Sequence, residues 1–187
     1  GDVNRKLDVE PVIQVKEAGL SFSDSPVAYS WSDGDVETSK SNYKKGAVYT
    51  DGYWLTVEPA ESDRILTFWS GVWQAEGKLS FFGSEADAAV FEAAQSAGGN
   101  AVTWQYTVYI PGGQGLRGLA EVVNRAVGDG NVTLAGLALA ELKTDEDSDF
   151  TVADYPAAIN LTEAGTLDWM HVDAENPEAG QQIIRKD

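Results

Sequence analysis

Hydrophobic and polar residues alternate with a period of two along much of this chain. The clearest example is Val-Thr-Trp-Gln-Tyr-Thr-Val-Tyr-Ile at 102–110, which ends at Pro111-Gly112-Gly113. Successive side chains of a strand point to opposite faces of a sheet, whereas one face of a helix recurs about every 3.6 residues. Other alternating segments end at the turn-forming pairs Asp33-Gly34 and Asp51-Gly52. The alternation therefore predicts a protein built from short β-strands joined by tight turns.

The predicted strands recur at short intervals over the whole sequence. They lie at 12–16, 27–31, 47–49, 53–57, 65–72, 78–82, 102–110, 131–142, 158–162, 166–171 and 181–186. Such spacing is typical of sandwiches and barrels rather than of folds in which strands and helices alternate. The alanine-rich stretch 84–96 predicts one short helix or structured loop, and 116–127 fits a helix or a strand. We predict an all-β fold, a jelly-roll-like antiparallel β-sandwich with one short helix.

The composition excludes several functional classes. The chain has 30 acidic and 13 basic residues, a net charge of −17, so its surface repels nucleic-acid phosphates and anionic lipids. No apolar run approaches the roughly 20 residues that cross a bilayer. The absence of cysteine rules out disulfides, thiol catalysis, zinc–thiolate sites and iron–sulfur clusters. We expect no nucleic-acid partner and no membrane insertion.

The residues that usually carry catalysis form no recognisable pattern. His171 is the single histidine, and it follows Trp169 in a predicted strand, where we expect a structural hydrogen bond rather than a catalytic triad. The many acidic residues offer so many carboxylate pairs that none stands out as that of a glycoside hydrolase. The segment Gly112-Gly113-Gln114-Gly115 is typical of a turn, not of a phosphate-binding loop. We predict that the chain is not an enzyme.

An acidic stretch, Lys-Thr-Asp-Glu-Asp-Ser-Asp at 143–149, interrupts the β pattern. Its charge predicts an exposed connector. We therefore divide the chain into a β-sandwich body at 1–142, an acidic connector at 143–157 and a C-terminal strand pair at 158–187. This strand pair completes either the same sandwich or a neighbouring one.

Several motifs of the chain match one known type of module. They are Asn-Leu-Thr-Glu-Ala-Gly-Thr-Leu-Asp-Trp-Met-His at 160–171, Tyr-Ser-Trp-Ser-Asp-Gly at 29–34, Leu-Thr-Val-Glu-Pro-Ala at 55–60, Ile-Leu-Thr-Phe-Trp-Ser-Gly-Val-Trp at 65–73 and Gly-Lys-Leu-Ser at 77–80. Together they resemble the galactose-binding-like β-sandwich module that is repeated in large secreted and cell-surface bacterial proteins. The resemblance implies a non-catalytic, extracellular or cell-surface protein.

The order of these motifs departs from that of the module. The motif at 160–171, which opens the module, lies near the C-terminus, and Arg5-Lys6 is matched by Arg185-Lys186. The body would lack its first strands unless the C-terminal strands fold back onto it or enter a neighbouring molecule. Both routes stay open, and our main hypothesis takes the second. In it, a structural module assembles head-to-tail with copies of itself or adjacent repeats into a fibre or repeat array. The donated strands would be anchored by Leu161, Leu167, Trp169, Ile183 and Ile184.

Two kinds of ligand are further hypotheses. The alternative function is a carbohydrate-binding, lectin-like module of a secreted adhesin or glycoside hydrolase, because sugar sites combine aromatic rings with hydrogen-bonding groups. The aromatic candidates are Tyr53, Trp54, Trp69 and Trp73. Clustered carboxylates also suit calcium, which prefers several oxygen ligands. The calcium candidates are Asp33, Asp35, Asp145, Asp147, Asp149, Asp173 and Glu175.

Overall fold

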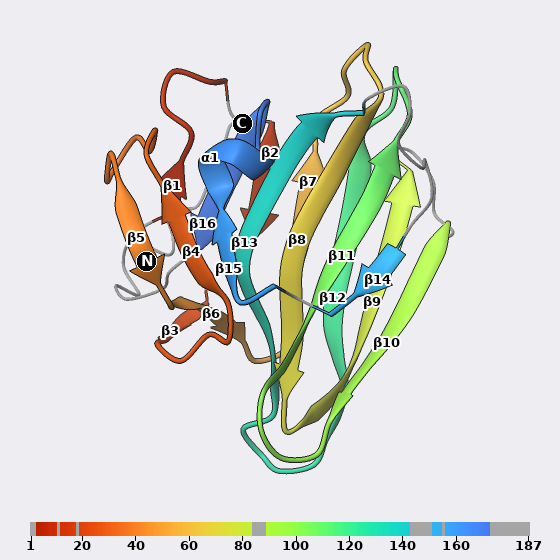
Figure 1. Cartoon of the computed structure of the whole chain (residues 1–187). Coiled ribbons are helices and arrows are strands. Elements are labelled where there is room, and N and C mark those ends of the chain that lie inside the picture. Colours follow the sequence, from red (N-terminus) through yellow and green to blue (C-terminus); the bar gives the residue numbers. More distant parts are fainter. Residues whose placement is uncertain are drawn as a thin grey trace.

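The computed structural model describes residues 3–10, 12–17, 19–83, 89–142, 151–154 and 156–172. These residues form sixteen strands and one short helix (Figure 1). All strand pairs are antiparallel except one, between β15 (Ala158–Asn160) and β4 (Ala28–Trp31). The prediction of an all-β sandwich with one short helix is confirmed. No helix in the described part of the chain is long and apolar enough to span a membrane.

Two large sheets and one small sheet make up the fold. The eight-stranded sheet has the order β1 (Val3–Arg5), β16 (Asp168–Val172), β13 (Asn131–Glu141), β8 (Arg64–Trp73), β11 (Val102–Ile110), β14 (Thr151–Ala153), with β6 (Gly46–Tyr49) pairing β13 and β3 (Leu20–Phe22) pairing β6. The five-stranded sheet has the order β10 (Phe91–Ala97), β9 (Ala75–Gly83), β12 (Leu116–Arg125), β7 (Gly52–Val57), β2 (Ile13–Lys16). The small sheet contains β15, β4 and β5 (Lys40–Tyr43).

The main hydrophobic core lies between the two large sheets. Alternate residues of each strand enter it, as the strict alternation of burial along β7 shows. Phe68 of the eight-stranded sheet stacks on Tyr106 at 5.1 Å between ring centroids and meets Phe81 of the five-stranded sheet edge-on at 5.7 Å. This interdigitation of aromatic rings from facing sheets is the usual packing of a sandwich.

A second core covers the outer side of the eight-stranded sheet. The small sheet and α1 (Leu161–Ala164) lie against this side, opposite the five-stranded sheet (Figure 1). Its fully or almost fully buried members include Tyr29, Trp69, Leu161 and Trp169. The eight-stranded sheet is therefore a middle layer over part of its area, with a hydrophobic face on each side.

Strand β16 completes the sheet of its own chain. It lies between β1 and β13, and Asn4 is opposite His171 in the pairing with β1. Two of the predicted anchors, Leu161 and Trp169, are fully buried in the second core, and Leu167 packs partly buried against the main core. The other two, Ile183 and Ile184, lie outside the described residues. Because β16 is paired on both edges within the chain, the arrangement gives no support to donation of this strand to a neighbour.

Two local predictions were wrong. The stretch 84–96 was predicted to be a short helix or structured loop, but residues 91–97 form the strand β10, which pairs with β9 over seven residues. Pairing at the sheet edge overrides the helical preference of the alanines, and Gln95 turns inward, where its Nε2 donates to the hydroxyl of Tyr106 at 2.6 Å. Residues 84–88 lie outside the described part.

The single helix instead occupies part of the segment 158–162 that was predicted as a strand. Asn160 caps α1 by accepting a hydrogen bond from the Thr162 backbone N–H at 3.2 Å, and Leu161 enters the second core. The ambiguous stretch 116–127 forms a strand, β12, over Leu116–Arg125. Within the predicted connector 143–157, the described residues include β14, whose three residues are exposed.

Candidate functional site

The four aromatic candidates lie in different environments. Tyr53 is buried in the main core, where its hydroxyl donates to Ser70 Oγ at 2.7 Å, and burial raises its pKa. Trp69 is 1% exposed in the second core, and its Nε1 donates to Gln105 at 3.2 Å. Neither ring can stack on a sugar that arrives from solvent. Trp54 on β7 and Trp73 at the end of β8 are half-buried, on different sheets.

Trp54 belongs to a row of side chains on the outer side of the five-stranded sheet. Because β7 alternates strictly, Tyr53 and Leu55 point into the main core while Trp54 points outward. The same alternation on the next two strands turns further side chains outward. They are Arg117, Leu119 and Glu121 on β12 and Lys78, Ser80 and Phe82 on β9. We call this set together with Trp54 the outer face; Ser80 is buried and all its other members are half-buried.

The centre of the outer face is an aromatic pair. Trp54 and Phe82 lie on strands separated by β12, yet their ring centroids are 6.0 Å apart with an interplanar angle of 36°. Leu119 of the intervening strand is opposite both Trp54 and Ser80. The guanidinium carbon of Arg117 lies 5.7 Å from the Phe82 centroid, within the range of a cation–π contact. A half-exposed apolar surface thus runs across three strands.

Phe82 was missed by the sequence analysis. The sequence predicts one strand at 78–82. It does not single out Phe81 or Phe82 as the ring that faces solvent. The alternation along the strand could have identified Phe82. Leu79 and Phe81 both enter the core, so Phe82 points outward.

Charged side chains of β9, β10 and β12 lie on the same face of the sheet as the aromatic pair. Lys78 Nζ lies 2.7 Å from a carboxylate oxygen of Glu92 on β10, and Ser80 Oγ lies 3.3 Å from the same oxygen. The hydrogen bond with Glu92 raises the pKa of Lys78, and that of Glu92 is lowered by the same contact. Glu121 is opposite Lys78 in the pairing of β12 with β9. Lys78 can donate to a polar ligand, and Glu92 and Glu121 can accept from one, whereas Ser80 is 3% exposed and holds Glu92 in place.

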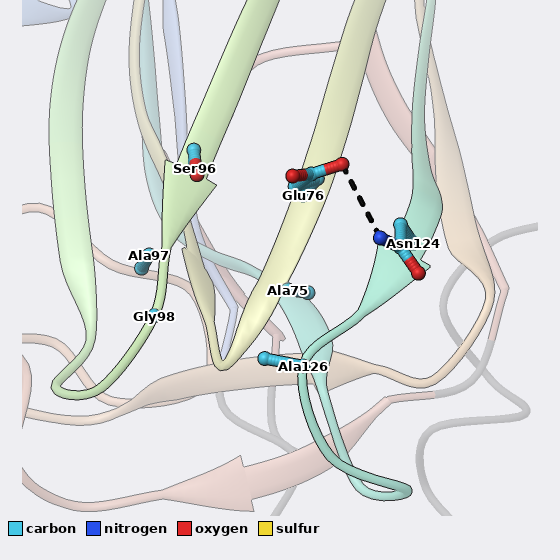
Figure 2. A pocket seen from close by; sticks show the side chains of 7 residues that line it. All are labelled: Ala75, Glu76, Ser96, Ala97, Gly98, Asn124 and Ala126. Carbon is cyan, nitrogen blue, oxygen red and sulfur yellow. Dashed lines mark hydrogen bonds between the residues drawn. The ribbon is translucent and has the colours of Figure 1, made fainter.

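A small pocket lies at the far end of the same sheet. Its lining comes from the ends of β9, β10 and β12 and contains Ala75, Glu76, Ser96, Ala97, Gly98, Asn124 and Ala126 (Figure 2). The Asn124 amide donates to Glu76 at 3.5 Å, as the dashed line in Figure 2 marks. Its volume of about 90 Å³ is well below the roughly 300–1,000 Å³ of ordinary small-molecule sites. Alone, the pocket can hold only part of a ligand.

The calcium candidates inside the described ranges have protein partners. Asp33 accepts hydrogen bonds from the Thr162 hydroxyl and from Trp169 Nε1, the latter at 2.9 Å, and pairs with Lys6 at 3.4 Å. Desolvation opposes its ionisation, but these partners together lower its pKa. Asp35 accepts from the backbone N–H of Arg5 at 2.9 Å. Over the described ranges, no three acidic, histidine or cysteine side chains gather as a metal site. The remaining candidates, Asp145, Asp147, Asp149, Asp173 and Glu175, lie outside those ranges.

His171 occupies a closed aromatic environment. It is 1% exposed, and the rings of Tyr29, Trp31 and Tyr43 lie with their centroids 5.1–5.2 Å from its own. Its Nε2 lies 3.1 Å from the carbonyl oxygen of Lys45. The surroundings are those of a structural residue through which β16 packs against the small sheet.

Comparisons with known proteins give similarities of fold at low identity. No family model and no curated protein matches the chain. A solved structure of CBM6cm-2, the carbohydrate-binding module of Cellvibrio mixtus lichenase 5A in complex with cellotriose, aligns with a TM-score of 0.36 and 17% identity over 72% of this chain and 99% of that one. The C-terminal CBM6 of LamC, a marine laminarinase from Zobellia galactanivorans, aligns with a TM-score of 0.37 and 13% identity over 75% and 100%.

A third structure, TmCBM61 in complex with β-1,4-galactotriose, aligns with a TM-score of 0.33 and 11% identity over 55% of this chain and 73% of that one. Scores this low do not indicate which residues of the present chain bind a ligand.

Proposed function

We propose that this chain is a non-catalytic carbohydrate-binding module that holds a glycan on the outer face. The observation that carries the proposal is the half-exposed Trp54–Phe82 pair, 6.0 Å between centroids, with the guanidinium of Arg117 against Phe82 and the ion pair of Lys78 and Glu92 on the same face. A sugar ring has apolar C–H faces and a rim of hydroxyl groups. It therefore binds where flat aromatic rings are bordered by hydrogen-bonding groups.

Other ligands that stack on aromatic rings fit this chain less well. Nucleic-acid bases also stack on exposed aromatics, but a net charge of −17 opposes the approach of their phosphates. A protein partner is the other class of occupant for a half-exposed apolar surface. The mixed charges beside the rings, Lys78, Glu92 and Glu121, favour a neutral ligand rich in hydroxyl groups, because hydroxyls can donate to carboxylates and accept from ammonium groups. We propose that the module acts outside the cell or at its surface, where polysaccharides are encountered.

Head-to-tail assembly by strand donation is the main function predicted from the sequence. It requires β16 to pair with another molecule, and β16 pairs with β1 and β13 of its own chain. No observation on the described residues favours it over carbohydrate binding, so we do not propose it.

The test is binding to soluble polysaccharides by the wild-type chain and two matched variants. Neutral β-glucans, galactans and xylans, with alginate as an acidic comparison, are screened by affinity electrophoresis, and dissociation constants follow from isothermal titration calorimetry. We expect Trp54→Ala to weaken binding by about fivefold to tenfold, since loss of one stacking contact removes about 1–1.4 kcal/mol. Trp73→Ala is the control, because this half-buried tryptophan lies on the other large sheet.

Three results would overturn the proposal. The first is a wild-type chain that binds none of the neutral polysaccharides. The second is a Trp54→Ala variant that folds normally and binds as the wild type does. The third is loss of binding in Trp73→Ala alone, which would move the site to the eight-stranded sheet.

A further inference from the structure

The outer face and the small pocket lie on the same strands. Along β9, the outward positions run from Phe82 through Ser80 and Lys78 to Glu76, which lines the pocket. Beside it, β12 runs from Arg117 and Leu119 to Asn124, which also lines the pocket. The strands are neighbours throughout this length. The aromatic pair and the pocket are thus two ends of one continuous surface.

The length of this surface exceeds that of a single sugar. Phe82 and Glu76 are six residues apart on one strand, and a strand rises about 3.3 Å per residue, so the two ends are about 20 Å apart. Lys78 and Glu121, which are opposite each other and half-buried, lie between the ends, and Lys78 pairs with the exposed Glu92 of the adjacent strand. Polar groups are therefore present along the whole distance.

The pocket forms because the strand pairing changes there. The register of β12 against β9 shifts between Val122 and Asn124, and a bulge of this kind re-aims the side chains beside it. Small residues, Ala75, Ala97, Gly98 and Ala126, leave space between the strand ends. The polar lining consists of a carboxylate from Glu76, an amide from Asn124 and a hydroxyl from Ser96, each on a different strand (Figure 2).

We infer that the outer face binds an extended stretch of a neutral linear polysaccharide along β9 and β12, with the pocket as its far subsite. This inference rests on the proposed function of the outer face. At about 90 Å³ the pocket accepts a ring substituent, such as a hydroxymethyl group, rather than a whole ligand. Amide, hydroxyl and carboxylate groups hydrogen-bond to such a substituent. The Glu76 carboxylate repels an acidic sugar, so the ligand class is neutral.

The experiment measures affinity against ligand length. Dissociation constants are determined by calorimetry for the disaccharide and the hexasaccharide of the neutral polysaccharide that binds best in the screen described above. We expect the wild-type chain to bind the hexasaccharide about tenfold more tightly than the disaccharide. In Asn124→Ala and Glu76→Gln, both at exposed positions, we expect this ratio to fall to about one to three.

A second readout reports on the pocket directly. The side-chain amide signals of Asn124, assigned in the ¹H–¹⁵N spectrum by their loss in Asn124→Ala, should shift with the hexasaccharide and not with the disaccharide. The proposal is overturned if the wild-type affinity does not depend on length, or if both pocket variants keep the full ratio and the Asn124 signals do not move. In those cases Trp54→Ala would still weaken binding of the disaccharide, so the proposed function would stand. Failure of that function would instead show as a wild-type chain that binds neither ligand.

Discussion

The outer sides of the two large sheets are built from the same alternating pattern but end in opposite environments. Trp69 of β8 and Trp54 of β7 both point away from the core that the sheets share. Trp69 is buried beneath the small sheet, with Tyr29 edge-on at 5.8 Å. Trp54 stays half-buried beside Phe82. The role of an outward aromatic residue is therefore decided by which later or earlier segment folds over it, not by its own strand.

Polar groups differ between the two sides in the same way. On the covered side, the carboxylate of Asp33 holds three segments together through Thr162, Trp169 and Lys6. On the open side, the ion pair of Lys78 and Glu92 is exposed on both side chains. The polar groups of the covered side fix the fold, and those of the open side stay accessible to solvent.

The largest effect on stability is expected from a charge placed in the second core, on the covered side. Trp169→Asp would place a carboxylate at a fully buried site, with Trp31 at 5.6 Å between ring centroids and Asp33 nearby. A buried charge without a partner costs several kcal/mol, so we expect the variant not to fold. Circular dichroism and size-exclusion chromatography measure this.

Leu167→Asp introduces the same charge at a less buried position and should destabilise the fold less. Leu167 is only half-buried, so we expect it to lower the melting temperature without abolishing folding. The wild-type chain should elute as a monomer over a wide concentration range, since β16 is paired within the chain. A folded, soluble Trp169→Asp variant, or a wild-type chain that polymerises as its concentration rises, would show that β16 is not part of its own sandwich.

The second effect compares the two outward tryptophans directly. Trp69→Ala removes a side chain that is 1% exposed and should lower the free energy of unfolding by about 3–5 kcal/mol. Trp54→Ala should lower it by only about 0.5 kcal/mol, the usual scale of surface changes, while it weakens the proposed glycan binding. Urea denaturation followed by tryptophan fluorescence gives both values. Equal losses of stability would mean that the outer face is as closed as the second core.

Much of the fold could be predicted from local sequence, because alternation is a local property. The nine-residue pattern at 102–110 became β11 over the same residues. The stretch 84–96 misled because alanine favours helices in isolation, whereas β10 gains its stability from pairing with β9. Asn160, a residue type that favours helix N-caps, could have predicted the start of α1. The strand-like residues before it favoured a continuous strand over 158–162 instead.

The candidate site was predictable only in part, because it depends on pairing between strands distant in sequence. Trp54 was identified from its residue type, and so was Trp69, which is buried. Phe82 joins Trp54 only because β12 lies between their strands in the five-stranded sheet. No local pattern in the sequence predicts that β9 and β7 both pair with β12. The aromatic pair could therefore be recognised only in the structure.

A third, smaller effect is expected from the hydrogen bonds and ion pair of Asp33 on the covered side, and it should depend on pH. Hydrogen bonds and Lys6 lower the pKa of Asp33 below its ordinary 3.8, so its ionised form stabilises the folded chain above that pH. This contribution is lost as the pH falls through the lowered pKa. Asp33→Asn should therefore lower the free energy of unfolding by about 1 kcal/mol at pH 7. Urea titrations should show that this gap in the free energy of unfolding between the wild type and Asp33→Asn narrows below pH 3.8. A gap that stays constant with pH would show that ionisation of Asp33 does not contribute.

The smallest effect is expected from the corresponding charge on the open side. Glu92→Gln removes the ion pair with Lys78, but both side chains are exposed, at 53% and 40%. Water and salt screen such a pair, and ordering two long side chains offsets most of the attraction. We expect no measurable change in melting temperature at any ionic strength, and a change in glycan affinity of less than about threefold, since a glutamine amide still offers an oxygen to Ser80. Differential scanning calorimetry in low and high salt, with Asp33→Asn as the matched carboxylate on the covered side, measures the contrast. If Glu92→Gln were as destabilising as Asp33→Asn, the charges of the open side would also be fixing the fold, and the difference between the two outer sides would not hold.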